Sequence, residues 1–269
     1  MAELPGNGAQ QPEGARVRPP MGPRIKQLRR RSIYLLPNLF TTAALFAGFY
    51  AIVQAMNGKF DVSAVAIFVA AVLDGLDGRI ARMTRTQSEF GAEYDSLSDM
   101  VSFGAAPALV MYEWILKDIG RFGWIAAFVY CASAALRLAR FNVNTDVVDK
   151  RFFQGLPSPG AAALVAGFIW LAHDNKIPLS EYGMPWVAGL VTLYAGLTMV
   201  SNAPFYNFKT VNWRKAVPFS VLLVVVLVFV LVSFNPPVVL FLLFCGYGLS
   251  GWVLWVMGVR AKPLPPGFS

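Results

Sequence analysis

Two apolar runs decide the fold class: VLLVVVLVFVLV at 221–232 and VVLFLLF at 238–244. A helix needs about 20 apolar residues to cross a bilayer, and the two runs extend to that length as segments 217–234 and 237–258. The whole chain of 269 residues is 56% hydrophobic and 14% charged, with a mean hydropathy of +0.53. Soluble domains carry about 25% charged residues. The composition therefore excludes a soluble domain and predicts one integral membrane domain.

Six further segments have the length and apolar content expected of membrane helices, namely 34–56, 62–82, 93–116, 122–141, 157–173 and 185–201. The predicted fold is therefore all-α, a polytopic membrane helix bundle with about eight transmembrane helices. Segments 157–173 and 185–201 are short. A bundle of six spans with additional interfacial segments is the alternative.

The polar flanks divide the chain into four predicted parts. Residues 1–23 are rich in Pro, Gly and Gln and predict a disordered tail. Residues 24–33 predict a basic interfacial segment, and 259–269 a short cytoplasmic tail. The predicted integral membrane domain is 34–258. No small-residue cleavage site follows the basic segment, so a cleaved signal peptide is not expected.

The positive charges are distributed unequally between the two predicted membrane faces. The net charge is +8, and 19 of the 23 Lys and Arg residues fall on the side that holds both termini; the exceptions are Lys59, Lys117, Arg121 and Lys176. The positive-inside rule then places both termini in the cytoplasm, which suits a bacterial-type inner membrane. The basic surplus is interpreted as facing anionic lipid, and a nucleic-acid partner is not expected.

The segment DGLDGRIARMTRTQSEFGAEYDSLSDM at 74–100 interrupts the apolar pattern with regularly spaced carboxylates. Asp74 and Asp77 lie three residues apart, and Asp95 and Asp99 lie four apart, so each pair occupies one face of its helix. The two helices are consecutive, within 62–116, and predict an antiparallel hairpin. We expect the four carboxylates to converge on one site at the cytoplasmic end of this hairpin.

Four carboxylates at membrane depth require compensation, because each costs roughly 2.5–3.5 kcal/mol near the bilayer centre. An oxygen-only cluster suits hard divalent cations. Salt bridges to Arg79, Arg82 and Arg85 are an alternative, and a proton or cation pathway is another. Divalent cations and Arg82 beside a pocket open to lipid together favour phosphoryl transfer on a lipid-linked phosphate.

The spacing of the aspartates and of the small residues and the arginine between them resembles the signature of the CDP-alcohol phosphatidyltransferases. It runs Asp74-x2-Asp77-Gly78-x2-Ala81-Arg82-x8-Gly91-x3-Asp95-x3-Asp99, with each fixed position filled. The resemblance covers roughly residues 33–175 well and the last three spans weakly. It implies a six-helix catalytic core and a homodimer.

The resemblance also implies roles for individual residues. Two divalent cations, Mg²⁺ or Mn²⁺, would be bound by Asp74, Asp77, Asp95 and Asp99, with Asp99 also the general base. The implied contacts to CDP-diacylglycerol are Asn38, Thr41, Gly78, Ala81, Arg82, Ser88 and Gly91. Asn38 and Thr41 belong to a Pro-Asn-x-x-Thr element at 37–41, which is equally typical of a capped helix N-terminus.

Three segments predict the acceptor: MVSFGAAPA at 100–108, LRLARFNV at 136–143 and FFQGLPSPGAAA at 152–163. Together they resemble the membrane-embedded phosphatidylserine synthases of bacteria and archaea. The residues expected near the acceptor or its phosphate are Ser102, Phe103, Arg137, Arg140 and Asn142. The two arginines equally suit contacts with lipid headgroups at a helix end. The turn at 155–160 is either a lid over the pocket or a simple turn.

The expected reaction transfers the phosphatidyl group from CDP-diacylglycerol to the hydroxyl of L-serine, giving phosphatidylserine and CMP. Glycerol 3-phosphate, inositol phosphate and choline remain alternative acceptors. Arg137 and Arg140 together would suit the phosphate group of the first two. A cation or proton transporter is the alternative from another class. A transporter is typically built from inverted repeats, and the sequence has none that we detect.

Overall fold

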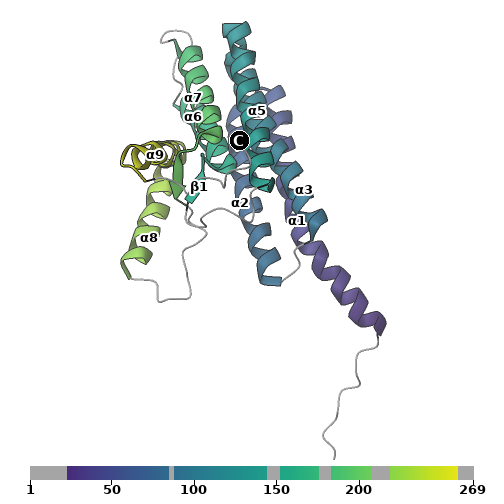
Figure 1. The fold of residues 1–269 in the computed structure, drawn as a ribbon. Coiled ribbons are helices and arrows are strands. Elements are labelled where there is room, and N and C mark those ends of the chain that lie inside the picture. Colours follow the sequence, from purple (N-terminus) through teal and green to yellow (C-terminus); the bar gives the residue numbers. More distant parts are fainter. Residues whose placement is uncertain (1–22, 85–87, 144–151, 176–182, 207–218, 260–269) are drawn as a thin grey trace, which may run out of the picture.

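The computed structural model describes residues 23–84, 88–143, 152–175, 183–206 and 219–259. These residues form a bundle of helices with one short strand pair (Figure 1). The helices in chain order are α1 (Pro23–Met56), α2 (Phe60–Thr84), α3 (Glu89–Asp99), the π-helix η1 (Met100–Ala105), α4 (Ala106–Trp114), the 3-10 helix η2 (Leu116–Ile119), α5 (Arg121–Val143), α6 (Ser158–Asp174), α7 (Met184–Val200), α8 (Phe219–Phe234) and α9 (Pro236–Val256). The strands are β1 (Phe152–Gln154) and β2 (Pro204–Tyr206).

The prediction of an all-α helix bundle is confirmed, and each predicted span coincides with one helix or one continuous helical segment. The third span is composed of α3, η1 and α4 in succession. Helix α1 begins at Pro23, so the basic segment and the first span share one helix. The predicted tails at 1–23 and 259–269 lie almost wholly outside the described residues. The four-part domain division stays a prediction.

Three of the described helices are long and apolar enough to cross a membrane, namely Asn38–Met56, Arg121–Val143 and Pro236–Val256. The apolar sequence of α2 is interrupted by carboxylates, although the helix is continuous. Helix α7 is apolar but shorter than these three helices. Helix α8 is apolar throughout, and its large side chains such as Leu223 and Phe229 are exposed. A wide apolar exterior is expected of a protein that faces lipid. The expected total of eight spans stays a prediction.

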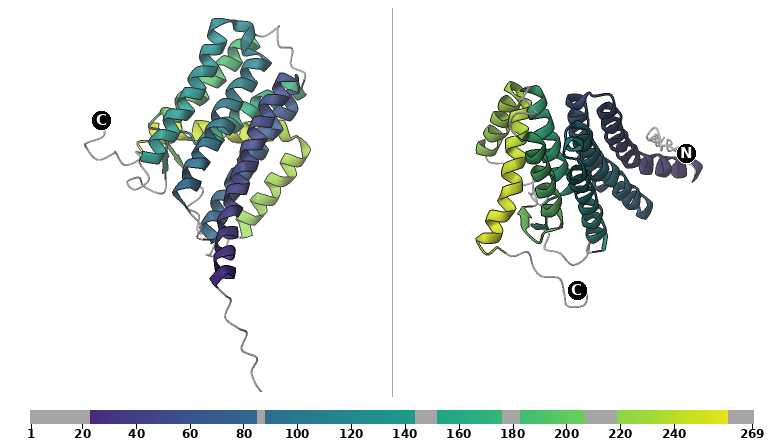
Figure 2. Two further views of the ribbon diagram at one scale, coloured as in Figure 1. Left: turned by 90° about the vertical axis from the view of Figure 1, so that its right-hand side faces the viewer. Right: turned by 90° about the horizontal axis from the view of Figure 1, so that it is seen from above.

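Helix α9 crosses the bundle instead of following it. Figure 1 views α9 almost along its own axis, whereas α1, α2 and α5 are seen from the side, and Figure 2 shows α9 lengthwise behind the bundle. Its inner side packs on α6 and on strand β2. The last helix therefore runs across one side of the bundle, next to α6.

Small residues let α1 and α2 pack closely. Ala47, Ala51 and Ala55 on α1 and Ala64 and Ala70 on α2 are all buried in the core. Without side chains beyond Cβ, the two backbones can approach and gain van der Waals contact, which drives helix association within a bilayer. This packing places the start of the carboxylate segment on α2 against α1.

The antiparallel pairing of β1 with β2 was not predicted. Phe153 pairs with Phe205, so the segment after α5 is joined to the segment after α7. The carbonyl groups at the end of α7 are bound in turn by Arg140 of α5, which is described below. The strand pair thus fixes the chain next to the start of α6, where one wall of the site is formed.

Candidate active site

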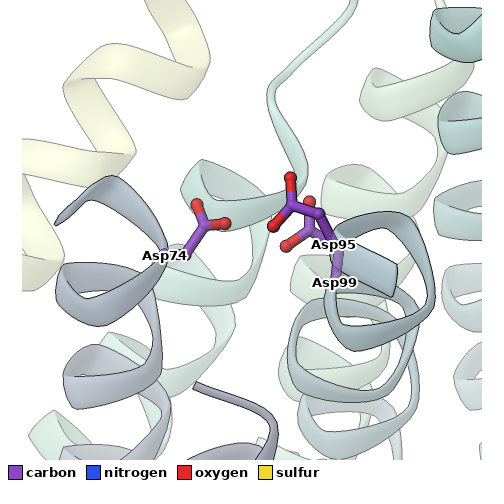
Figure 3. A group of neighbouring side chains, drawn as sticks. All are labelled: Asp74, Asp95 and Asp99. Atoms are coloured by element: carbon purple, nitrogen blue, oxygen red, sulfur yellow. The ribbon is translucent and has the colours of Figure 1, made fainter. Parts of the chain in front are cut away.

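The spacing predicted that the four carboxylates of the hairpin would converge, and three of them meet in one cluster. Oxygen atoms of Asp74 on α2 and of Asp95 and Asp99 on α3 all lie within 4.8 Å of one another. Figure 3 shows Asp74 directed across the gap toward the other two. All three side chains are partly buried. Hydrogen-bonded helix backbones hold them there, so their mutual repulsion is opposed by the packing of the hairpin.

Asp77, the fourth carboxylate, is held by α1. Its Oδ2 accepts a hydrogen bond from Thr41 Oγ1 at 2.8 Å, and the side chain is 4% exposed. Asp77 lies between the two cavities described below and lines both. Thr41 therefore contacts a carboxylate that borders the site. The alternative interpretation of 37–41 as a capped helix N-terminus is wrong, because this element lies inside the continuous helix α1.

Helix α3 is positioned by hydroxyl groups. Ser88 is its N-cap, and Ser88 Oγ accepts from the backbone N–H of Gly91 at 3.0 Å, which satisfies one of the free donors of the first turn. Ser98 Oγ donates to the carbonyl of Thr41 at 3.1 Å. The hairpin is thereby attached to α1 at the level of the carboxylates.

A π-helical segment begins directly after Asp99. One wide turn shifts the direction of the side chains that follow, and such segments are frequent at functional sites. Here Ser102 Oγ donates to the Ala44 carbonyl at 3.1 Å, and Tyr130 Oη donates to the Phe103 carbonyl at 3.0 Å. Ser102 and Phe103 are fully buried and line neither cavity. Their side chains pack the segment that follows Asp99 against α1 and α5.

A cavity of about 320 Å³ lies on one side of the cluster. It is bordered by α1, α2 and α3, and all seven residues expected to contact CDP-diacylglycerol line it: Asn38, Thr41, Gly78, Ala81, Arg82, Ser88 and Gly91. Asp77, Ala92 and Asp95 complete the lining. Glycine and alanine keep one wall flat, so the cavity suits a flat polar group.

A cavity of about 920 Å³ lies on the other side. It shares Asp77, Gly78, Arg82 and Asp95 with the smaller cavity and adds Asp74 and Asp99. Its far walls come from α5, α6, α9 and both strands. Apolar side chains dominate there, including Leu138, Phe141, Phe153, Leu243 and Phe244. The carboxylates therefore lie at the junction of a small space lined by both polar and small apolar residues and a large, mostly apolar one.

Arg137 brings a buried cation to the larger cavity. The residue is 8% exposed, and its guanidinium interacts electrostatically with Asp99. Nη1 donates to Ser158 Oγ at 2.9 Å, and Nε has no hydrogen-bond partner among the described residues. Burying a charge is costly unless it is paired. The geometry leaves Arg137 able to receive an anionic group of a ligand. The sequence did not identify Ser158 as a site residue, because nothing in the segment 155–160 indicated that it would accept a hydrogen bond from Arg137.

Arg140 points away from the site. Its guanidinium donates to the carbonyls of Met199, Val200 and Ser201 at the end of α7, and also to the Gln154 carbonyl and the Asn202 side chain. Cations near a helix C-terminus are stabilised by the helix dipole. Asn142 is exposed and exchanges hydrogen bonds with Ser96. Neither Arg140 nor Asn142 lines either cavity.

The comparison with known families agrees with this geometry. Residues 34–200 match the family described as CDP-alcohol phosphatidyltransferase. The chain belongs to this family. The match begins in α1 and ends with α7, so it includes the hairpin, Arg137 and Arg140 of α5 and the turn into α6.

Relatives in the family carry a more specific name. A CDP-diacylglycerol–serine O-phosphatidyltransferase of Helicobacter pylori is 37% identical over 232 residues, which cover 84% of this chain and 94% of that protein. The protein of the same name from Mycobacterium leprae is 33% identical, over 71% of this chain and 65% of its own length. That from Methanocaldococcus jannaschii is 36% identical, over 53% and 62%.

The donor set fits the divalent cations on which this family generally depends. Three carboxylates with oxygens within 4.8 Å of one another supply only hard oxygen ligands, the kind preferred by Mg²⁺ and Mn²⁺. Of the arginines expected as salt-bridge partners, Arg79 is exposed, Arg82 lines both cavities and Arg85 lies outside the described residues. Asp95 lines both cavities, and Asp74 and Asp99 line the larger one, so the cluster is open to both.

Proposed function

We propose that this protein transfers the phosphatidyl group of CDP-diacylglycerol to the hydroxyl of L-serine, forming phosphatidylserine and releasing CMP. The observation that carries the proposal is the position of Asp74, Asp95 and Asp99 at the junction of a small cavity with several polar side chains and a large, mostly apolar one. A nucleotide-activated lipid has the same division, with a diphosphate between a nucleoside and two acyl chains. The names of the relatives from three organisms support the acceptor.

The substrate is proposed to lie across both cavities. The cytidine moiety occupies the smaller cavity against the flat wall of Gly78 and Ala81, with Asn38 and Ser88 as polar neighbours. The diphosphate lies beside the carboxylates and Arg82, which borders both cavities. The glycerol and the first part of the acyl chains occupy the larger cavity, where Phe141 and Leu243 provide apolar contacts.

Asp74, Asp77, Asp95 and Asp99 are proposed to hold two divalent cations, Mg²⁺ or Mn²⁺. When bound, such cations neutralise the diphosphate, polarise its phosphoryl oxygens and stabilise the leaving phosphate. Thr41 keeps Asp77 oriented through its hydrogen bond to Oδ2. Hydrogen bonds of this kind to a ligating carboxylate contribute to metal affinity.

Asp99 is the proposed general base. It accepts the proton from the serine hydroxyl, and the serine oxygen attacks the phosphorus atom that carries diacylglycerol. The bond from this phosphorus to the oxygen of the CMP phosphate breaks, and CMP leaves with the bonding electron pair. Arg82, a fixed cation beside the diphosphate, stabilises the charge that develops on CMP. A carboxylate is a weak base for an alcohol hydroxyl, so the electrostatics of the site must also favour the alkoxide.

The acceptor carboxylate is proposed to bind Arg137. This guanidinium is buried, is directed by Ser158 and interacts with Asp99. A phosphorylated acceptor would favour a second cation nearby, but Arg140 is bound by oxygen atoms around the end of α7. One buried cation suits a single carboxylate, which supports serine over glycerol 3-phosphate or inositol phosphate.

An acceptor assay tests this function. Purified full-length protein in detergent receives CDP-diacylglycerol, Mg²⁺ or Mn²⁺, and one labelled alcohol from the set L-serine, glycerol 3-phosphate, inositol phosphate and choline. We expect labelled lipid and stoichiometric CMP with serine alone. Efficient labelling by a phosphorylated alcohol or by choline, with none by serine, would contradict the proposed acceptor. Labelling by none of them would contradict the transferase proposal.

The protein is further proposed to be a multi-pass protein of the bacterial-type inner membrane, acting as a homodimer, with the site and both termini at the cytoplasmic face. The support is the excess of 19 among 23 basic residues on one predicted side, next to anionic lipid. The C-terminal end of α2 and the N-terminal end of α3, near which the carboxylates lie, belong to that side. Labelling of single cysteines introduced near Lys59 and near Arg79 in sealed cells would test the orientation, because only the former should react with an impermeant reagent.

A further inference from the structure

Helix α9 borders the active site, although it lies beyond the residues that match the family. The match ends at residue 200, and α9 covers Pro236–Val256. Four of its residues nevertheless line the larger cavity: Leu243, Phe244, Tyr247 and Ser250. These residues belong to the middle of α9, which runs across the bundle (Figure 1), so this part of the helix borders the cavity. The site therefore has a wall that the shared family domain does not supply.

Tyr247 is the α9 residue next to the proposed acceptor position. It lines the cavity together with Asp99, Arg137 and Ser158. On the same side, its ring approaches Gly160 in the first turn of α6, where a Cβ would lie 3.4 Å from Tyr247 Cε1. The ring thus occupies the space that a side chain at residue 160 would otherwise take.

The ring is fixed from behind. Tyr247 Oη donates to the Tyr206 carbonyl at 3.2 Å, and the ring of Phe205 meets that of Tyr247 edge to face at a centroid distance of 5.6 Å. Phe205 is itself fully buried, and a Cβ at Gly251 would overlap its ring. The pairing of β2 with β1 holds Phe205 in register. A side chain held on this many sides cannot turn away easily, because packed interiors resist displacement.

We infer that α9 closes the acceptor end of the active site and that the ring of Tyr247 limits the size of the acceptor alcohol. The inference rests on the proposed function. A hydroxy acid whose carboxylate contacts Arg137 and whose hydroxyl faces Asp99 lies against this ring. An additional methylene between the two groups would press the acceptor into a wall that does not yield. Serine then fits, and its homologue with one more methylene does not.

A competition experiment tests the size limit. Full-length protein is given CDP-diacylglycerol, a divalent cation and equal concentrations of L-serine and L-homoserine, and mass spectrometry measures the ratio of the two lipid products. Wild type should favour serine. Tyr247→Ala should raise the share of the homoserine product by about tenfold or more, the scale on which one methylene is discriminated. Tyr247→Leu should raise it less, and Tyr247→Phe, which keeps the ring, should preserve the wild-type ratio.

The ratio separates a size limit from a purely structural role. A variant that only disturbs folding lowers both products alike and leaves their ratio unchanged; an unchanged ratio in Tyr247→Ala or Tyr247→Leu would overturn the inference. Tyr247→Leu retains a bulky apolar side chain and decides the question if the alanine variant does not fold. Two folded variants that make neither product would assign Tyr247 another role and would also overturn it.

The control variant is Leu249→Ala, which changes an exposed residue of the same helix and should keep the wild-type ratio. A shift as large as that of Tyr247→Ala would show that any change in α9 alters selectivity, and so would contradict the specific role of Tyr247. Failure of the proposed function is recognised separately, because wild type would then make no phosphatidylserine at all.

Discussion

Thr41 connects helix α1 to both halves of the carboxylate hairpin. Its hydroxyl donates to Asp77 Oδ2 at 2.8 Å, and its carbonyl accepts from Ser98 Oγ at 3.1 Å. Asp77 belongs to α2, and Ser98 immediately precedes Asp99 on α3. One residue of α1 therefore fixes the relative positions of two helices whose carboxylates must meet. This contact also explains why Asp77 is buried and lies beside the three clustered carboxylates.

The hydroxyl of Thr41 is predicted to support metal binding. Thr41→Val removes the hydrogen bond but keeps the shape, so Asp77 loses its orientation. Loss of such a partner typically lowers metal affinity by about 10–100-fold. The Mn²⁺ concentration that gives half-maximal CMP release should rise correspondingly, and Thr41→Ser should restore the wild-type value. If the valine and serine variants require the same Mn²⁺ concentration as wild type, the hydrogen bond has no such role.

Asp99 is predicted to carry the proton transfer. Asp99→Asn cannot accept the proton, and the rate of CMP release should fall by at least about 100-fold, in the usual range for a lost general base. Asp118→Asn is the matched control, because Asp118 lies in η2, is exposed and lines neither cavity. A rate for Asp99→Asn within twofold of the control would remove Asp99 from the mechanism.

Substitutions of Arg137 and Arg140 in α5 are predicted to have different effects. Arg137→Lys replaces a fixed fork with a point charge and should raise KM for serine by about tenfold or more, with little change in KM for CDP-diacylglycerol. Arg140→Lys should instead lower the melting temperature, because the carbonyls at the end of α7 lose their donors. Steady-state kinetics and thermal unfolding of both variants check this. The opposite pattern would exchange the two roles.

Gly91 is predicted to keep the smaller cavity open. A Cβ at this position would lie 3.1 Å from Ser88 Oγ and 3.4 Å from Asn38 Oδ1. Forcing a larger side chain into packed space costs about 1–3 kcal/mol, so Gly91→Val should raise KM for CDP-diacylglycerol about tenfold while KM for serine changes little. Gly246→Val, where a Cβ meets nothing within 4 Å, serves as the control. Equal effects in both variants would be inconsistent with a nucleotide wall at Gly91.

Much of the fold followed from local sequence. Apolar runs predicted the helices, since each is long enough to signal by itself. The i+3 and i+4 spacings predicted that four carboxylates would converge, and three of them, Asp74, Asp95 and Asp99, do so. The seven residues expected around the nucleotide all line one cavity. The three carboxylates meet because the hairpin of α2 and α3 is local in sequence and its geometry follows from helix periodicity, whereas the nucleotide contacts stay a prediction.

Contacts between distant segments were beyond such reasoning. Arg137 and Arg140 are both arginines of the same helix end, so the sequence alone does not distinguish them. Arg140 differs because it donates to carbonyl groups at the end of α7, about 60 residues further along the chain. The π-helix after Asp99 and the pairing of β1 with β2 also depend on tertiary contacts, since neither segment is distinctive alone. Tyr247 was hidden for the same reason, because α9 is apolar throughout and its crossing of the bundle leaves no local pattern.

The most direct test of the account is the metal dependence of serine-dependent CMP release. Purified protein with CDP-diacylglycerol and L-serine is treated with excess chelator and then given Mg²⁺ or Mn²⁺. The account predicts that CMP release stops with chelator, resumes with the added cation and is absent in Asp95→Asn at ordinary cation concentrations. Full CMP release in the chelator would contradict the role assigned to the carboxylate cluster.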